Sequence, residues 1–317
     1  MNSVPDAMPS TASPTLIDGK RSRSTWRDSR WARSARLLGV ALALGGWVLG
    51  LGVFAYLIAR DGGLTVGVDL QAYLLAGDNL LAGREVYWGQ LGEASAFYYA
   101  PPWAVLFAAL SWVPDLATQW AMMGLGLVAI RYAVGSWLWA GLVFWYPVSV
   151  MVLQAGNIEF LIAAAMVLAA RGHAGPLAFT AFAKVAPIFG VPRNGWREAV
   201  LVIGIAMLIT LPWLDLWPAW IESLLSQPTQ TDVHIGPPWY LRLPFALALL
   251  LLRRPWARAM AVVVAMPAFW LGSLVLLIAV IRLWLDERGS GTSRSRADEP
   301  GEPGARSRCA APSFIQP

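Results

Sequence analysis

The segment Gly67–Trp103 carries the residues best suited to chemistry. It reads GVDLQAYLLAGDNLLAGREVYWGQLGEASAFYYAPPW and separates two strongly apolar runs. Asp69 and Tyr73 are four residues apart, so they share one face if this part is helical. A carboxylate in an aromatic-rich loop can act as a general base toward an alcohol, because a free hydroxyl is a poor nucleophile while it keeps its proton. The alternative interpretation is a solvated loop carboxylate without a chemical role.

Two charged residues lie inside apolar segments, where charge is costly. Lys184 is in the middle of Leu177–Val191, and a cation at mid-membrane costs roughly 2.5–3.5 kcal/mol on insertion scales. We therefore expect Lys184 to contact a phosphate or a carboxylate in a cavity, or else to pair or snorkel for structural reasons alone. Glu159, an acid in an earlier apolar run, is a candidate partner for Lys184, and Arg131 is the other candidate partner for Glu159.

Two further residues lie in the second predicted loop, Trp217 to about Trp239, and at the start of the span that follows it. Arg242 can clamp a phosphate through its planar guanidinium group. His234 can bind a sugar or a phosphate, or assist a proton transfer. The alternative interpretations are an interfacial arginine and a solvated loop histidine.

Amide and phenol side chains complete the candidate binding residues. Gln154 and Asn157 are three residues apart and can share a helix face, from which they bond to a substrate or tie two helices together. Of these two roles we favour the tie between helices. Four tyrosines can stack on sugar rings or form an ordinary interfacial belt, and we favour the belt for most of them: Tyr73, Tyr87, Tyr98 and Tyr99.

The composition predicts a membrane protein made of helices. The 317 residues are 57% hydrophobic and only 14% charged, whereas a soluble domain has about 25% charged residues. The apolar runs are long and do not alternate, and a helix satisfies its own backbone hydrogen bonds in lipid, so we expect an all-α polytopic protein. The 18 tryptophans suit helix ends at membrane interfaces.

Little in the sequence favours redox or metal chemistry. The single Cys309 lies in the polar C-terminal tail, which excludes an internal disulfide, and two histidines without a cysteine cluster argue against a His/Cys metal site. We therefore expect neither a metal nor a cofactor. The net charge of +5 comes largely from arginines in the two tails, and it indicates orientation and contact with anionic lipid rather than nucleic-acid binding.

The chain divides into a membrane domain between two polar tails. Residues 1–36 are expected to be a disordered basic tail in the cytoplasm, residues 37–285 the membrane domain, and residues 286–317 a second disordered tail. Arg60 to about Ala96 is then an extracytoplasmic loop with amphipathic helices along the interface. About nine spans are expected: Leu37–Ala59, Phe97–Val113, Leu116–Ile130, Val134–Leu153, Ile158–Ala170, Leu177–Val191, Ala199–Leu216, Leu243–Leu252 and Ala259–Leu285.

Prolines and glycines refine this arrangement. Pro101-Pro102 is expected in the first turn of its helix, where a missing N–H costs little. Pro114-Asp115 is expected to form a tight cytoplasmic turn, and Pro267 to kink or split the last long apolar run. Gly46 and Gly50 form a small-xxx-small pair, which indicates close helix packing.

The order of motifs in the first loop resembles glycosyltransferase family 87 of the C-type (GT-C) superfamily. The loop has D-L-x-x-Y from Asp69, then L-L-x-G-x-x-x-Y ending at Tyr87, then F-x-Y-x-P-P from Phe97. Further on, Q-A-G-N from Gln154 is similar to the family's G-Q-x-N, and K-x-x-P from Lys184 also looks like the family. The resemblance covers about residues 64 to 200, with weaker similarity to 245.

This resemblance implies an integral-membrane, inverting hexosyltransferase with a GT-C-like helical fold. Such an enzyme takes a hexose, mannose by family precedent, from a polyprenyl-phosphate sugar and gives it to an extracytoplasmic lipid or glycan acceptor. Asp69 corresponds to the proposed general base, and the expected partners are the lipid-linked donor, the acceptor and membrane lipids, with no nucleic acid. The expected location is the cell membrane, and the expected substrate-binding residues are Lys184, His234, Arg242, Tyr73, Asn157 and Gln154.

Two other classes of function remain as alternatives. A transporter or lipid flippase would have inverted repeats and paired broken helices in two halves, and the sequence shows no such symmetry. A structural or assembly membrane protein would need no chemistry, and the concentration of polar and aromatic residues in the first loop argues against it.

Overall fold

The computed structural model describes residues 21–88, 96–226 and 235–297, with side chains described from residue 31 to residue 289 within those ranges. Every regular element in those ranges is a helix, which confirms the all-α class. The chain forms two compact units, Met1–Leu42 and Ala43–Pro317. Of the first unit the structure describes Arg21–Leu42, the beginning of helix α1 (Arg21–Arg60).

Both terminal helices extend into segments that were expected to be disordered. Helix α1 begins at Arg21, within the basic tail, and α13 (Leu277–Ala297) continues beyond residue 285. Once an apolar segment has nucleated a helix, each added residue gains a hydrogen bond, and arginine is a good helix former. The expected disorder of residues 1–20 and 298–317 lies outside the described residues.

One described helix is long and apolar enough to cross a membrane, Trp31–Arg60 within α1. The number rises to three if two bent pairs each count as one span: α4 (Asp115–Val134) with Trp137–Trp145, bent by 111°, and α6 (Val148–Gln154) with α7 (Glu159–Ala170), bent by 98°. Three further apolar helices are shorter, namely α3 (Pro101–Leu110), α11 (Trp239–Leu251) and α12 (Pro255–Val264). These lengths leave the expected nine spans unconfirmed.

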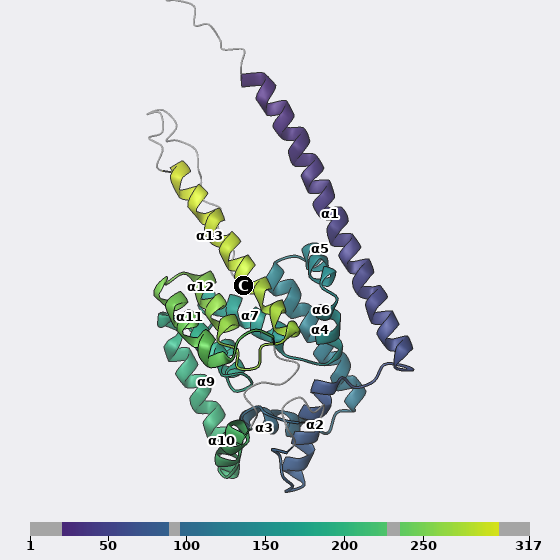
Figure 1. Ribbon diagram of the computed structural model, residues 1–317, viewed down its shortest axis with the longest axis vertical. Coiled ribbons are helices and arrows are strands. Elements are labelled where there is room, and N and C mark those ends of the chain that lie inside the picture. Colours follow the sequence, from purple (N-terminus) through teal and green to yellow (C-terminus); the bar gives the residue numbers. More distant parts are fainter. Residues whose placement is uncertain (1–20, 89–95, 227–234, 298–317) are drawn as a thin grey trace, which may run out of the picture. The chain divides into compact units, whose positions relative to one another are not determined.

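Helix α7 is the centre of the second unit (Figure 1). It contacts α4, α8 (Gly175–Thr180), α13 and the 3-10 helix η5 (Leu271–Leu276). Ile162, Ala163 and Val167 are fully buried, and most of the other α7 residues are buried too. A helix that is apolar on every side needs neighbours on every side, and α7 has them.

Helix α2 (Val68–Leu81) packs along α3. A Cβ at Gly77 would lie 2.5 Å from the main-chain nitrogen of Ala108, which shows how closely the two backbones approach. Pro101 and Pro102 occupy the first turn of α3, as predicted. With ten residues α3 is about 15 Å long, half the thickness of the hydrocarbon core.

The expected span Val134–Leu153 is broken into three pieces. These are α5 (Trp137–Ala140), the 3-10 helix η1 (Gly141–Trp145) and α6, which begins after Pro147. The pieces pack on the second half of α1: a Cβ at Gly46 would collide with the main-chain oxygen of Gly141, and a Cβ at Gly50 would lie 2.8 Å from the Phe144 ring. The predicted close packing at Gly46 and Gly50 is therefore confirmed.

The expected helix Leu177–Val191 is a short hairpin instead. Helix α8 ends at Thr180, the chain turns at Lys184, and the 3-10 helix η2 (Ala186–Gly190) returns. Pro187 lacks an N–H and disfavours helical geometry in the residue before it, which ends the helix here. The two arms of the hairpin pack closely, because a Cβ at Gly190 would lie 2.9 Å from Cδ2 of Leu177.

The remaining helices complete the bundle. They are η3 (Arg193–Gly195), α9 (Trp196–Ile209), η4 (Leu211–Trp213), α10 (Leu216–Ser226), α11, α12, η5 and α13. Helices α11 and α12 pack against each other as a hairpin. The break between α12 and η5 contains Pro267, so the long final run is split as predicted.

The contacts between helices show that most helix termini of the second unit lie at one of its two ends. What we call the Asp69 end holds the starts of α2, α3, α4 and α7, together with Lys184 and Trp270. What we call the arginine end holds the ends of α4 and α7 and the starts of α9 and α12. Three contacts fasten the arginine end: Arg282 Nη1 donates to Val134 O at 2.7 Å, Arg171 lies 4.0 Å from Asp286, and Arg254 pairs with Glu287.

Candidate functional site

The start of α2 is fastened to the Q-A-G-N turn between α6 and α7. The backbone N–H groups of Asp69 and Leu70 both donate to Ala155 O at 3.0 Å. Gly156 has φ +72, and a Cβ there would lie 2.6 Å from the Cβ of Leu70, so this turn requires a glycine. The backbone of Asp69 is therefore held by main-chain contacts and not by its side chain.

Gln119, on α4, forms hydrogen bonds with both segments of this junction. Its Oε1 accepts from Gly67 N at 2.9 Å, its Nε2 donates to Gln154 O at 2.8 Å, and the side chain is fully buried. The start of α4 thus lies at the Asp69 end, which corrects the expectation that the Pro114-Asp115 turn lies opposite the first loop. The signal was available in the sequence, since Gln119 is a polar residue in an apolar run.

A hydrogen bond joins Asp69 to Asn157. Asn157 Nδ2 donates to Asp69 Oδ2 at 2.7 Å, while Asn157 Oδ1 accepts from Glu159 N at 3.1 Å. Both ends of the amide are engaged, so its orientation is fixed. Among the described residues nothing donates to Asp69 Oδ1, which leaves one carboxylate oxygen available to an incoming hydroxyl.

Glu159 lies behind this pair as a buried acid with a cationic partner. Its side chain is fully buried and forms an ion pair with Lys184 Nζ through Oε1, which also accepts from Trp270 Nε1 at 3.0 Å. The predicted pairing of Glu159 with Lys184 is confirmed. Glu159 Oε2 is buried and has no hydrogen-bond partner among the described residues. Nothing in the sequence distinguished Trp270 from the other tryptophans.

The surroundings raise the pKa of Asp69 from 3.8 to about 6. Burial is the largest cause, because it penalises the charged form, and the negative charge of Glu159 adds to it. The hydrogen bond from Asn157 and the positive charge of Lys184 act in the opposite direction. Asp69 is thus ionised at neutral pH and is more basic than an ordinary carboxylate, as a general base requires.

Tyr73 lies inside an aromatic cluster instead of facing a sugar or an interface. Its side chain is buried, its ring centroid lies 5.0 Å from those of Tyr99 and Phe107, and its hydroxyl is 2.7 Å from the Tyr99 hydroxyl. Tyr87 is buried in the same cluster and donates to Tyr99 O at 3.1 Å. Neither the predicted sugar contact nor the interfacial belt describes Tyr73 or Tyr87, since both pack as core residues.

Arg242 links separate segments of the chain through hydrogen bonds to main-chain oxygens. Its three nitrogens donate to main-chain oxygens of Pro237, Val264 and Met266 at 2.8–2.9 Å, and its guanidinium lies 5.1 Å from the centre of the Phe269 ring. These contacts link the start of α11 to the end of α12 and to the chain that follows it, and they favour the structural interpretation over a phosphate clamp. His234 lies outside the described residues.

Gln154 and Asn157 both tie elements together, as we favoured. Gln154 Nε2 donates to Asp61 Oδ2 at 3.3 Å, linking the Q-A-G-N turn to the end of α1. Asn157 links the same turn to α2. Of the predicted site residues, the structure therefore brings Asp69, Asn157 and Lys184 into one connected network through Glu159, with Gln154 at its edge.

Within residues 21–88, 96–226 and 235–297, no group of three or more His, Cys, Asp or Glu side chains is placed to hold a metal ion. Searches among protein-family models, curated proteins and solved structures find no match to this chain.

Proposed function

We propose that the chain is an integral-membrane glycosyltransferase that moves a hexose, mannose by precedent in family 87, from a polyprenyl-phosphate sugar to an extracytoplasmic lipid or glycan acceptor. The observation that carries the proposal is the Asp69–Asn157 hydrogen bond of 2.7 Å, which fixes one carboxylate oxygen and leaves the other open. The family resemblance supplies the reaction class, and the raised pKa of Asp69 supports a role as base.

In this reaction Asp69 Oδ1 removes the proton of the acceptor hydroxyl. The hydroxyl oxygen attacks the anomeric carbon, and the bond from that carbon to the phosphate oxygen breaks, with the electron pair leaving on the phosphate. A single displacement of this kind inverts the configuration at the anomeric carbon. Asn157 acts as a positioning residue for the base, because its amide fixes the direction in which Asp69 Oδ1 is presented.

The charges at the two ends support an orientation. Among the described residues, the arginine end of the second unit carries nine arginines and three acids: Arg131, Arg171, Arg193, Arg197, Arg253, Arg254, Arg258, Arg282 and Arg288, with Glu198, Asp286 and Glu287. Positive residues collect on the cytoplasmic side of membrane proteins. We infer that the arginine end faces the cytoplasm and that Asp69 faces the opposite side.

This orientation replaces nine straight spans with eight passages between the two faces. They are α1, α4, the broken segment α5–α6, α7, α9, α11, the broken segment α12–η5, and α13. In this arrangement α2, α3 and α10 stay at the outer face, and the α8–η2 hairpin enters from the cytoplasmic face and returns. Nine alternating spans would put three crossings between Asp69 and Asn157, whereas their hydrogen bond supports placing both residues at one face.

The direct test uses purified full-length protein with a radiolabelled polyprenyl-phosphate mannose and a membrane lipid extract. The wild type should transfer label to a lipid, and Asp69→Asn should lower the rate by about 10²–10⁴-fold, the usual contribution of a general base. Asp78→Asn is the matched control, because Asp78 is an exposed acid on the same helix. Full transfer by Asp69→Asn would remove Asp69 as the base.

Uptake of the lipid-linked sugar by vesicles, without any glycosidic product, would instead support the transporter alternative. Melting temperatures of both variants should match that of the wild type to within a few degrees, so that a lost activity cannot be ascribed to unfolding. A panel of polyprenyl-phosphate sugars in the same assay identifies the hexose.

A further inference from the structure

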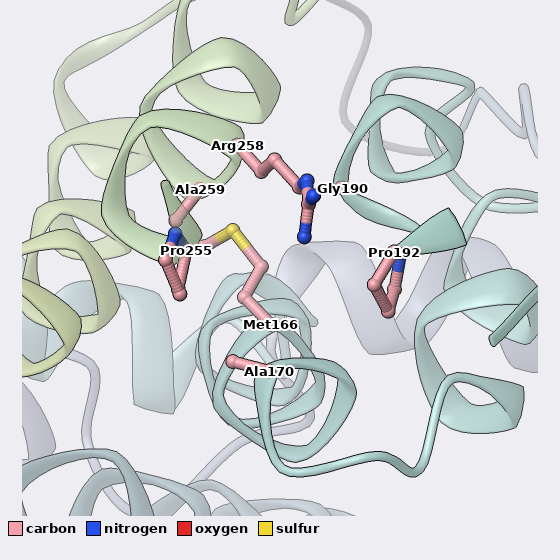
Figure 2. Close-up of a pocket in the computed structure, with 7 residues that line it drawn as sticks. All are labelled: Met166, Ala170, Gly190, Pro192, Pro255, Arg258 and Ala259. Atoms are coloured by element: carbon pink, nitrogen blue, oxygen red, sulfur yellow. The ribbon is translucent and has the colours of Figure 1, made fainter. Parts of the chain in front are cut away.

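A hollow at the arginine end is too small to be a ligand site (Figure 2). Met166, Gly190 and Arg258 lie around it. It has room for about one water molecule, and Met166 in its wall is buried. A fully buried glutamine at the Asp69 end, by contrast, has contacts that bear directly on the candidate site.

Gln119 lies in the second turn of α4, and its two polar groups bond to different segments. Its Oε1 accepts from the Gly67 backbone N–H at 2.9 Å, and its Nε2 donates to the Gln154 carbonyl oxygen at 2.8 Å. Gly67 is two residues before Asp69, and Gln154 is three residues before Asn157. Gln119 therefore bridges the two segments whose side chains form the Asp69–Asn157 hydrogen bond.

The main-chain hydrogen bonds of this junction do not by themselves fix the direction of α2. The N–H groups of Asp69 and Leu70 both donate to one atom, Ala155 O, at 3.0 Å. Hydrogen bonds tolerate a broad range of angles at a carbonyl oxygen, so a single acceptor atom acts as a pivot about which α2 can tilt. The Gln119 amide is a second point of attachment, supplied by another helix, and it prevents that tilt.

The turn that carries Asn157 is held to α6 by its own main chain. Gly156 N donates to Leu153 O, and Asn157 N donates to Val152 O, both at 3.1 Å. A displacement of Gln154 would therefore move Asn157 with it. The contacts of Gln119 thus determine how the segment of Asp69 and the segment of Asn157 lie relative to each other.

An amide side chain suits this position because the two segments present opposite groups. The first N–H groups of a helix and the last carbonyls of a helix have no partner within their own helix. Gln119 meets one group of each kind, at the start of α2 and at the end of α6. An ionised carboxylate only accepts hydrogen bonds, and a methionine thioether is a weak acceptor that cannot donate.

We propose that Gln119 is a positioning residue for Asp69: its amide holds the start of α2 against the Q-A-G-N turn, which keeps one carboxylate oxygen on Asn157 and the other open to a hydroxyl. The inference deepens the proposed function and rests on it for the reaction that Asp69 carries out. The placement of the carboxylate itself does not depend on that reaction.

Gln119 acts on Asp69 without adding a charge. The charged groups that act on Asp69 are Glu159 on α7 and Lys184 in the turn of the hairpin, and a neutral substitution of Gln119 leaves both in place. The hydrogen bond from Asn157 lowers the pKa of Asp69, so a loss of that bond raises it. A purely structural role of Gln119 would lower stability without changing this pKa.

The test compares wild-type protein with Gln119→Met, which has a similar shape and forms neither hydrogen bond, in the full chain purified in detergent. The pKa of Asp69 is followed by infrared spectroscopy, from the protonated-carboxyl band that is absent in Asp69→Asn. It should rise from about 6 by up to about one pH unit, the effect of one lost hydrogen bond. In the transfer assay kcat should fall at least about tenfold, while KM changes by less than about twofold.

Gln71→Met is the matched control, because Gln71 is an exposed glutamine on the same helix as Asp69. It should change neither the pKa of Asp69 nor kcat. If Gln119→Met does not fold, Gln119→Asn takes its place: the shorter amide reaches only one of the two partners, and the pKa of Asp69 should rise by a smaller amount.

Gln119→Glu tests the need for a donor separately. Burial raises the pKa of the introduced carboxyl, which donates to Gln154 O only while it is protonated. Relative to wild type at the same pH, this variant should therefore be most stable below about pH 4.3 and lose stability as the pH rises through the raised pKa. The stability deficit of Gln119→Met should not depend on pH in this way.

An unchanged pKa of Asp69 in folded Gln119→Met or Gln119→Asn would overturn the proposal. A Gln119→Glu variant whose relative stability is the same at every pH would also overturn it, because the donor would then be unnecessary. Absence of transfer by the wild type would instead count against the proposed function, and the infrared measurement would still decide the role of Gln119.

Discussion

At the scale of single residues, the site depends on one carboxylate whose basicity is set by its neighbours. Asp69 is held by Asn157, and the buried Glu159–Lys184 pair stands directly behind that amide. Glu159 raises the pKa of Asp69 and Lys184 lowers it. The pair thus contributes two opposing effects on the base, and each can be removed separately.

The first prediction concerns the pH dependence of the wild type. A general base must be deprotonated to accept a proton, and the pKa of Asp69 in the folded protein is about 6. The value of kcat/KM should therefore be low at pH 5, rise through about pH 6 and reach a plateau near pH 7. A rate that falls as the pH rises through this range would contradict the role of Asp69 as base.

The second prediction concerns the charges behind the base. Glu159→Gln removes a negative charge, so the pKa of Asp69 should fall and the rising limb of kcat/KM should move to lower pH. Lys184→Met removes a positive charge, so the limb should move to higher pH. Opposite shifts in the two variants are the diagnostic result, because a purely structural role would lower the rate without moving the limb.

The stability of the same variants provides a third prediction. Lys184→Met leaves Glu159 buried and unpaired, and breaking a buried pair in this way costs about 3–5 kcal/mol. The double variant Glu159→Gln/Lys184→Met removes both charges and should recover much of that loss. Thermal unfolding of the single and double variants in one detergent measures the difference. A double variant less stable than Lys184→Met would contradict this explanation.

At the scale of elements, the candidate site forms where the start of α2 and the start of α4 both contact the Q-A-G-N turn. The Q-A-G-N turn accepts the start of α2 on its main chain and directs Asn157 toward Asp69. Gly67 and Gly156 allow this approach, since a Cβ at Gly67 would collide with the main-chain oxygen of Gln154. The position of Asp69 is therefore a property of the junction between α2 and the turn.

The fourth prediction tests this junction. Gly67→Ala should displace the start of α2, lower the transferase rate by at least tenfold and reduce the melting temperature, because the added methyl group meets backbone and not a flexible side chain. Gly124→Ala is the matched control: it lies in α4 with nothing within 4 Å, and alanine is favoured over glycine in a helix by about 1 kcal/mol. Wild-type activity in Gly67→Ala would show that the junction does not place the base.

The sequence indicated which charged residues belong to the network better than it indicated where the surrounding side chains lie. Charges in apolar runs are costly, so the sequence indicated Lys184 and Arg131 as candidate partners of Glu159, and the structure shows that Lys184 is the partner. The core position of Tyr73 was missed, because an aromatic residue in a core and one in an interfacial belt have the same local pattern. The role of Arg242 depends on carbonyl groups from a segment more than twenty residues away, which no local pattern indicates.

The expected span count stays unconfirmed for a related reason. Hydropathy detects apolar runs but does not show whether a run crosses, turns back or lies along a neighbour. The runs that begin at Phe97 and Leu177 are apolar, yet α3 packs along α2 and the second run folds back at Lys184. Short helices whose polar ends are satisfied by the protein itself are tolerated inside a bundle.

At the scale of the whole molecule, the two ends of the second unit differ in charge and in kind. Within the part of the chain that the structure describes, most acids lie at the Asp69 end and most arginines of the second unit lie at the arginine end. The eight passages proposed above would place both polar tails on the same side of the membrane. The arginines of both tails agree with that arrangement under the positive-inside rule.

The fifth prediction follows from this even number. Eight passages put the C-terminus in the cytoplasm with the N-terminus, whereas the nine spans expected from hydropathy would put it outside. A green fluorescent protein fused after Pro317 should fluoresce, and alkaline phosphatase fused at the same point should be inactive, because each reporter functions on only one side of a bacterial inner membrane. A fusion within the first loop, near Gly83, should give the reverse pattern and serves as the control. Active phosphatase at the C-terminus would restore an odd number of crossings, and the bent segments α5–α6 and α12–η5 would then be the first assignments to revise.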